Sequence, residues 1–410
     1  MPLLQWVSFA LCCISHPSPQ GLAGAQGCHM KHPFSSYRKL FPILQRTAQL
    51  SSCSQSALSL PVRRAIDDYL EVWLQRGADW GYWMEQVALA RAEFARMIHA
   101  EPGDVAVLGS VSDAASSIAS ALDFSAERRE IVTTTLDFPS LCHVWLAQQP
   151  RGAQVRFVQA QAGGTRTSAQ IAEAIGARTA LVSVSQVCFY DGQIVDIAAT
   201  GRAARAQGAL QFVDAYQSAG AVSIDVRAQE LDMLAAGAQK YLLGIPGIAF
   251  LYVRPTLAQR LRPTITGWFG RVDPFAFDPL HLDFADGAAR FNTGTPPMMC
   301  ACAARASMAL LNEIGIPAIE AYLAELSALA LEEAARLGLS VASPGACGAP
   351  VAKGANTAIH IPNAARVEAQ MLQSGYVVSA RNDVIRIAPH FYNQADEVVG
   401  ALRELARLTR

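Results

Sequence analysis

From about residue 103 to residue 253, short apolar runs alternate with stretches of helical periodicity. Stretches such as SAQIAEAIGA and IAATGRAARAQGA place apolar residues three and four positions apart, which is typical of amphipathic helices. Strands that alternate with helices favour a parallel sheet covered by helices. We therefore predict an α/β fold with a mostly parallel, seven-stranded sheet. The strand candidates are DVAVLGS, EIVTTTL, QVRFVQA, TALVSVSQV, ALQFVDA, DMLAAGA and IAFLYVR.

The pattern on either side of this region is different. Upstream, residues 62–100 are helical by their apolar spacing, and downstream a helical stretch at 301–337 precedes short strands and a final helix. We interpret residues 301–410 as a small C-terminal α+β domain and residues 61–300 as a large domain. Residues 30–60 are expected to form an N-terminal segment that joins the small domain.

Residues 1–29 do not share either pattern. They include the apolar run LLQWVSFALCCI but no Lys or Arg, whereas a secretory signal begins with a basic segment. The run is also too short and too interrupted for a membrane span. We interpret Met30 as the natural start and residues 1–29 as a disordered or non-native extension, with a cleaved signal as the alternative.

Charge and cysteine content narrow the expected partners. The chain has 33 basic and 34 acidic side chains and no charge run, so neither nucleic acid nor a membrane is an expected partner. Its nine cysteines are scattered, without a Cys-x-x-Cys pair or a His partner at metal spacing. We therefore expect no metal site and interpret the cysteines as small buried side chains of a cytoplasmic protein.

A single lysine, Lys240, lies in the otherwise apolar stretch AAGAQKYLLGIPGIAFLYVRP. Lysine is rarely buried without a partner, so its amine either reaches water or takes part in chemistry. Asp214 ends a strand candidate upstream, and ligands of open α/β sheets bind beyond the carboxyl ends of strands. Pyridoxal 5′-phosphate (PLP) needs both groups, because it forms a Schiff base with a lysine and pairs its pyridine nitrogen with an acid. Ser112, which follows a strand and opens a helix, offers a hydroxyl and backbone N–H groups for the phosphate.

Each of these residues has a commoner structural explanation when it is taken alone. A lysine is usually solvated, an Asp at a strand end usually belongs to a turn, and a Ser before a helix is usually a cap. Their order along the chain and their positions beside predicted strands agree with one another. Together they predict a PLP site.

The stretch FVDAYQSAGAVSIDVRAQELDMLAAGAQKYLLGIPGIAFLYVRP resembles the class V aminotransferase family, which includes cysteine desulfurases, kynureninases and transaminases. The resemblance extends over roughly residues 40 to 410. It implies the PLP-dependent transferase fold type I, in which the large domain binds the cofactor. It implies also that Lys240 forms the Schiff base and later moves a proton, and that Asp214 pairs with the pyridine nitrogen.

The same resemblance implies roles for other residues around the cofactor. Gln217 matches the residue that bonds the phenolic oxygen, and Phe138, in LDFPS, matches the aromatic residue that stacks on the pyridine ring. Ser112 and Gln239 match positions that contact the phosphate. An ordinary core position is the alternative explanation for Phe138.

Two further segments match the family near the C-terminal end of the large domain and beyond it. In ARFNTGTPP, Gly294 and Thr295 match a pair that reaches the phosphate of a neighbouring subunit, which implies a homodimer with shared active sites. In VIRIAPHFYN, Arg386 matches the arginine that binds the substrate carboxylate as a two-pronged donor. Arg381 is the nearest competitor, and an ion pair between domains is the alternative role of either arginine.

The chain departs from the family's cysteine desulfurases and kynureninases. No cysteine lies between Cys347 and Arg386, where the desulfurases carry their nucleophile, so a persulfide is not expected. Cys53 falls in a segment that commonly lines the substrate site and is therefore a candidate substrate contact, but we favour a buried structural thiol.

The stretch TGWFGRVDPFAF resembles the Gly-Trp-Phe-Gly-His segment of kynureninases, but Arg271 replaces the His. Thr295 replaces the asparagine that precedes their Pro-Pro pair. Both changed positions recognise the kynureninase substrate, so that activity is not expected here. Trp268 is expected to reach the phosphate or to wall the pocket, and Arg271 to place a cation near the distal end of the substrate.

The resemblance therefore implies a PLP-dependent enzyme that acts on a small-molecule substrate, an amino acid, through a Schiff base to Lys240. We place transamination ahead of a carbon–carbon or carbon–sulfur lyase reaction of the kynureninase type, and racemisation or epimerisation remains open. A nicotinamide-dependent oxidoreductase would need a Gly-x-Gly-x-x-Gly turn, which the segment LGSVSDAASS lacks. A non-catalytic PLP-fold binding module is the remaining alternative, against which the intact Lys240, Asp214 and Arg386 argue.

Overall fold

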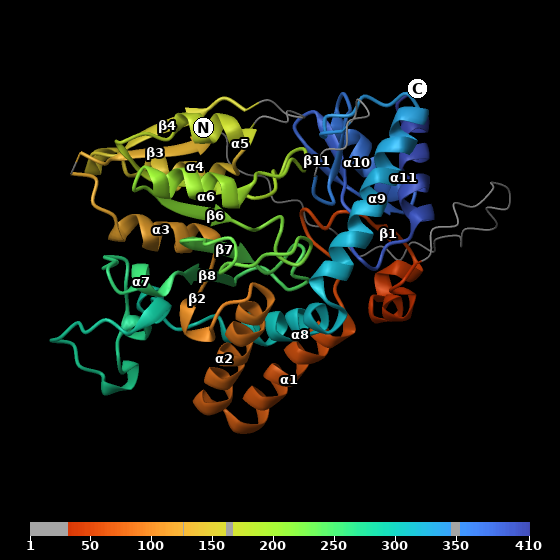
Figure 1. Cartoon of the computed structure of the whole chain (residues 1–410). Helices are drawn as coiled ribbons and strands as arrows, with labels where there is room; N and C mark the ends of the chain where they lie inside the picture. Colours follow the sequence, from red (N-terminus) through yellow and green to blue (C-terminus); the bar gives the residue numbers. More distant parts are fainter. Residues whose placement is uncertain (1–31, 126, 161–166, 346–352) are drawn as a thin grey trace, which may run out of the picture. The chain divides into compact units, whose positions relative to one another are not determined.

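The largest sheet of the computed structural model has seven strands in the order β2-β8-β7-β6-β5-β3-β4, within the part of the chain that the structure describes (Figure 1). β8 is antiparallel to both of its neighbours, and every other neighbouring pair is parallel. The predicted mostly parallel, seven-stranded sheet is therefore confirmed, and each strand candidate contains one strand. The strands are β2 (Val105–Leu108), β3 (Glu130–Thr134), β4 (Gln154–Val158), β5 (Thr179–Ser185), β6 (Leu210–Asp214), β7 (Met233–Gly237) and β8 (Ala249–Val253).

The structure describes residues 32–125, 127–160, 167–345 and 353–410. The expected extension over residues 1–29, the interpreted start at Met30 and Cys347 lie outside the described residues. Because residues 32–410 form one compact unit, the limits of the large and small domains remain predictions.

Helices pack on both faces of the seven-stranded sheet, as two successive residues of β8 show. Phe250 stacks on Phe94 of α2, with ring centroids 4.8 Å apart. The next residue, Leu251, is buried in a cluster with side chains of α3 and α4. Successive side chains of a strand point to opposite faces, so α2 lies on one face and α3 and α4 on the other. The helices of this part are α1 (Leu60–Arg76), α2 (Trp80–Met97), α3 (Val111–Ala121), α4 (Pro139–Leu146), α5 (Thr167–Ala174), α6 (Ile197–Ala206) and α7 (Pro255–Ala258).

The C-terminal part holds a separate antiparallel sheet in the order β11-β12-β9. The N-terminal segment lies against this part, because β1 runs parallel to β10 and Ser51 bridges Ala388. Phe34 and Phe41 both pack edge-on against Phe391, with ring centroids 5.8 Å apart in each pair. The strands are β1 (Ala48–Gln49), β9 (Thr357–His360), β10 (Tyr376–Val377), β11 (Ser379–Arg381) and β12 (Val384–Ile387), and the later helices are α10 (Ala364–Gln373) and α11 (Ala395–Leu408).

Two long helices connect the two parts. α8 (Met298–Ile314) packs on α1 and α2, and α9 (Ile316–Arg336) packs on α11. Among the described residues, no single helix is long and apolar enough to cross a membrane, and α8 and α9 pass that test only as a pair bent by 80°. The predicted boundary between residues 300 and 301 lies inside α8.

Candidate functional site

A pocket of about 150 Å³ opens at the carboxyl edge of the seven-stranded sheet. Ser185 is the last residue of β5, Asp214 is the last residue of β6, and Lys240 follows β7. These parallel strands end at the same edge, which is where ligands of open α/β sheets bind. The residues that line the pocket are Phe138, Ser185, Val187, Phe189, Asp214, Tyr216, Gln217, Gln239 and Lys240. The structure therefore brings together five of the residues that the sequence singles out.

The Lys240 amine lies between two aromatic rings in this pocket. Its Nζ is 4.4 Å from the ring centroid of Tyr216 and 5.4 Å from that of Phe138. Burial lowers the pKa of Lys240 to about 8, because water cannot solvate the ammonium there, and the nearby carboxylate of Asp214 opposes this shift. At pH 7 roughly a tenth of this amine is therefore neutral, far more than for an ordinary lysine, and the neutral form is the one that a nucleophile requires.

The Asp214 carboxyl group is buried beside the amine. Burial raises its pKa to about 6, while the backbone N–H of Tyr216, which donates to Oδ1 over 2.8 Å, and the positive charge of Lys240 act in the opposite direction. The charged carboxylate is costly in this environment, so it will favour a cationic partner.

Phe138 directly precedes α4, and its ring lines the pocket. Its side chain is 37% exposed, and the ring is edge-on to Phe189, with centroids 5.1 Å apart. An exposed ring at this position leaves a face on which a flat ligand can stack.

Gln217 and Cys53 meet at the base of the site. The Gln217 side-chain amide donates to the backbone oxygen of Cys53 over 2.9 Å, so the N-terminal segment reaches the pocket wall. The Cys53 side chain is buried and is absent from the pocket lining, although it lies near enough to Lys240 to affect the pKa of that amine. Its predicted contact with a substrate stays a prediction.

Arg386 lies behind the pocket wall on β12 and is almost fully buried. Its Nη1 donates to the backbone oxygen of Phe189 over 2.7 Å, and its Nη2 donates to the Ser379 hydroxyl over 2.7 Å. Because Phe189 lines the pocket, the guanidinium is one residue away from the cavity. Arg381, the competitor for the carboxylate-binding role, is exposed.

Ser112 does not line the pocket among the described residues. The helix α3 is capped by Ser110, whose hydroxyl accepts the backbone N–H of Asp113 over 3.0 Å, so Ser112 lies in the first turn instead. β2 is antiparallel to β8, and β8 to β7, so β2 ends at the same edge as β7. The start of α3 therefore faces the edge that holds Lys240.

Three predicted site residues lie elsewhere in this single chain. Trp268 packs against Trp80, with ring centroids 5.8 Å apart, and Thr295 is exposed. Arg271 forms an ion pair with Asp283 over 2.7 Å. None of the three lines the Lys240 pocket, and their predicted roles stay predictions.

The sequence reasoning missed four lining residues: Ser185, Val187, Phe189 and Tyr216. Ser185 could have been found by applying to β5 the strand-end rule that singled out Asp214. Tyr216 lies between the two singled-out residues Asp214 and Gln217, and Lys240 contacts its ring. Val187 and Phe189 follow β5 in an irregular segment whose path no periodicity predicts.

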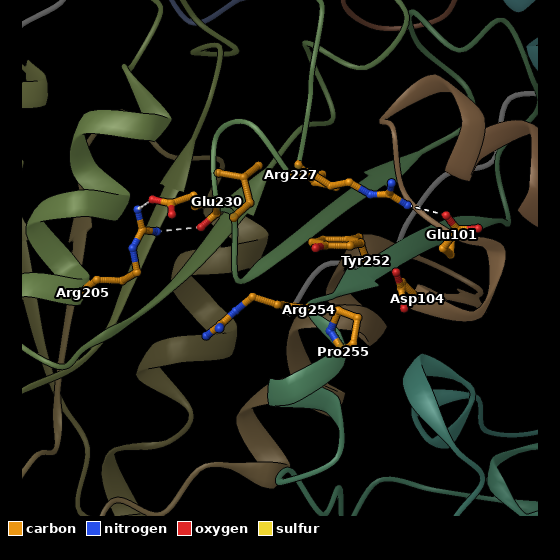
Figure 2. Close-up of a pocket in the computed structure, with 10 residues that line it drawn as sticks. Glu101, Asp104, Arg205, Arg227, Glu230, Tyr252, Arg254 and Pro255 are labelled. Carbon is orange, nitrogen blue, oxygen red and sulfur yellow. Dashed lines mark hydrogen bonds and ion pairs between the residues drawn. The ribbon is translucent and has the colours of Figure 1, made fainter.

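A larger pocket of about 420 Å³ lies at the opposite, amino edge of the sheet (Figure 2). Its arginines already have acidic partners, since Arg205 pairs with Glu230 and Arg227 with Glu101. It holds no lysine, and we therefore assign the chemistry to the Lys240 pocket.

Comparison with known sequences agrees with this assignment. The sequence model of a family described as aminotransferase class-V matches residues 75–398. A Bacillus subtilis protein named "Uncharacterized aminotransferase YcbU" is 42% identical over 380 residues, which cover 93% of this chain and 99% of that protein. A "Probable cysteine desulfurase" of Methanothermobacter thermautotrophicus is 30% identical over 70% of this chain and 72% of its own. A "Kynureninase" of Xanthomonas oryzae is 28% identical over 63% and 65% of the two chains.

Solved structures share the fold. A cysteine desulfurase from Thermococcus onnurineus superposes with a TM-score of 0.82 at 22% identity, covering 93% of this chain and 98% of its own. A variant of C-DES with glycine covalently linked to its PLP cofactor gives a TM-score of 0.82 at 19% identity, covering 90% and 98%. These similarities confirm the predicted fold type I.

Proposed function

The chain belongs to the class V aminotransferase family, and we propose that it is a transaminase that removes the amino group of an α-amino acid at Lys240. Membership of this family makes it a PLP-dependent enzyme. When bound, PLP supplies an electron sink for the pair released by breaking a bond at the substrate α-carbon. The observation that carries the proposal is the joint position of Lys240 and Asp214 in one pocket at the carboxyl edge of the sheet.

The residues of the pocket fit this cofactor. Lys240, whose pKa is lowered to about 8, offers the neutral amine that covalent attachment needs. The buried Asp214 carboxylate suits a protonated pyridine nitrogen, which would supply the cation that it favours. The exposed face of the Phe138 ring suits a flat heterocycle.

The chain's own residues divide the work of the reaction. Lys240 Nζ would take the proton from the substrate α-carbon and hold it, which an amine of pKa about 8 does readily near neutral pH. Arg386 would orient the substrate carboxylate through the N–H groups that Phe189 and Ser379 leave free. Phe138 and Tyr216 exclude water from the amine on two sides.

Borohydride reduction tests the attachment. The enzyme reconstituted with PLP is reduced and digested, and we expect the pyridoxyl mass on the peptide that carries Lys240. Lys353 provides an internal control, because burial also lowers its pKa, to about 7, but its Nζ already donates to Ser327, Thr357 and the Gly354 oxygen. Label on Lys353 but not on Lys240 would refute the assignment.

A lyase reaction is the second candidate, and the similarity to proteins named kynureninase and probable cysteine desulfurase favours it. The two reactions differ when a single amino acid is added without a 2-oxo acid. A transaminase then releases one equivalent of 2-oxo acid per site and stops, because the nitrogen stays with the cofactor. Repeated turnover under the same conditions would establish the lyase instead.

We further propose that the enzyme works in the cytoplasm as a homodimer with shared active sites. Residues 265–282, which we call the 265–282 patch, include exposed apolar side chains such as Phe277, 73% exposed, and Leu280, 83% exposed. Trp268 stacks on Phe277 within this patch, with ring centroids 6.1 Å apart. Contiguous apolar surface of this kind is typical of an interface, and a second copy would cover it.

A further inference from the structure

A second buried carboxylate, Asp137, lies directly behind the pocket. It precedes Phe138, it is 5% exposed, and none of the ion pairs formed by the described residues includes it. Its Oδ2 accepts hydrogen bonds from the Thr133 hydroxyl and from the Thr134 hydroxyl and N–H, each over 2.9 Å. Its Oδ1 accepts the backbone N–H of Ser185 over 2.5 Å.

This arrangement suits a carboxylate rather than a neutral amide. Four donors converge on the two oxygens of Asp137, whereas an amide has only one oxygen to accept them. A buried charge without a counter-ion is costly, so a purely structural turn would be better served by a neutral side chain. The bonds also join the end of β3 to the end of β5, which fixes the backbone from which Phe138 enters the pocket.

Ser185 connects this carboxylate to Asp214. Its backbone N–H donates to Asp137, and its side chain lies near enough to Asp214 to act against the rise in the pKa of that carboxyl group. The connection follows from the sheet, because Ser185 and Asp214 are paired residues of the adjacent strands β5 and β6. The negative charge of Asp137 also contributes to raising the pKa of Asp214, since two nearby carboxylates repel each other.

We propose that Asp137 is a positioning residue of the cofactor site, which fixes Phe138 and Ser185 and whose buried charge strengthens the hold of Asp214 on the protonated pyridine nitrogen. The inference rests on the proposed attachment of PLP beside Asp214. Asp137 has two effects that can be separated. Its hydrogen bonds position Phe138 and Ser185 for any ligand, whereas its charge favours a ligand with a protonated ring nitrogen. A probe that lacks this nitrogen can therefore distinguish them.

The test measures the affinity of the full-length apoenzyme for PLP and for 1-deaza-PLP, in which a C–H group replaces the ring nitrogen. We expect Asp137→Asn to weaken PLP binding roughly tenfold, through loss of one buried charge near the nitrogen, and 1-deaza-PLP binding less than twofold. The matched control is Thr133→Val, which removes one hydrogen bond and keeps the charge, and which should change the ratio of the two affinities less than twofold.

Equal losses for both ligands would overturn the inference, because they would show a role in position alone. Unchanged PLP binding would overturn it as well. If Asp137→Asn fails to fold, Asp137→Ser takes its place in the same two measurements, because serine also removes the charge and its hydroxyl can still accept a hydrogen bond. A selective loss of PLP affinity in this variant supports the inference, and an equal or absent loss refutes it. Failure of the wild-type protein to bind PLP would instead refute the proposed function.

Discussion

Lys240 should make the apoenzyme less stable at neutral pH than it would be without this amine. Burial lowers the pKa of Lys240 from 10.5 to about 8, so the folded state disfavours the ammonium relative to the unfolded chain. One pKa unit corresponds to about 1.4 kcal/mol, and the shift therefore costs about 3 kcal/mol of unfolding free energy while the group is protonated in both states. The cost is fully present below pH 8 and disappears as the pH rises through 10.5, where the unfolded chain also loses the proton.

The perturbation that tests this reasoning is Lys240→Met, which keeps an unbranched side chain, one atom shorter, and removes the amine. Urea unfolding of the apoenzyme is measured for wild type and variant from pH 6 to pH 10.5. We expect the variant to be more stable by about 3 kcal/mol at pH 6 to 7 and the difference to shrink steadily above pH 8.

Comparison at each pH cancels the titration of groups that the two proteins share. Lys39→Met serves as the control, because Lys39 is exposed, and its difference from wild type should stay constant. A difference for Lys240→Met that does not vary with pH, or a wild type that is more stable at pH 7, would refute the argument that this amine is held in an unfavourable environment.

Three other perturbations test separate parts of the site. Asp214→Asn should lower kcat at least about a hundredfold in steady-state kinetics with saturating PLP, because the neutral amide cannot stabilise a protonated ring nitrogen. A much smaller decrease in kcat would contradict this role. Arg386→Lys should raise KM for the amino acid about tenfold or more with a smaller change in kcat, since a lysine cannot form the two-pronged bond; a change confined to kcat would contradict that role. Replacing both Phe277 and Leu280 by Glu should convert a dimer to a monomer in sedimentation experiments, and an unchanged mass would show that the 265–282 patch lies outside the interface.

The sequence predicted the strands of the large sheet and that most of them are parallel, but not that β8 is antiparallel to its neighbours. Apolar runs identify the central strands because a strand covered on both faces is apolar whatever its direction, whereas the edge strand β4, QVRFV, includes exposed Gln154 and Arg156. β8 runs against its neighbours, and the connection from β7 to β8 includes Gly244, Pro246 and Gly247 and contains no helix among the described residues. A parallel strand would have needed a longer connection, usually with a helix. The short connection that lacks a helix was therefore the sequence feature that indicated an antiparallel β8.

The positions of site residues could be predicted from the sequence where the residue lies at the end of a strand. They could not be predicted where the residue lies in a loop. Asp214 and Lys240 follow from the ends of β6 and β7, and the structure places both in one pocket. Ser112 lies in the first turn of α3 and Ser110 caps the helix, so the sequence located the start of this helix to within two residues, and the predicted phosphate contact stays a prediction. Arg271 and Thr295 belong to irregular segments whose position relative to a second chain no periodicity encodes.

The hydrogen bonds between residues 52–57 and Tyr392 have a consequence for folding during synthesis. Ser52 bonds the Tyr392 hydroxyl, which also accepts the backbone N–H of Ala57, and Cys53 between them meets Gln217. A chain that emerges from the ribosome in order makes Tyr392 335 residues after its hydrogen-bond partner Ala57. The bonds that hold the segment around Cys53 therefore form only after Lys240 has been made, and a nascent chain that stalls before residue 392 would lack them.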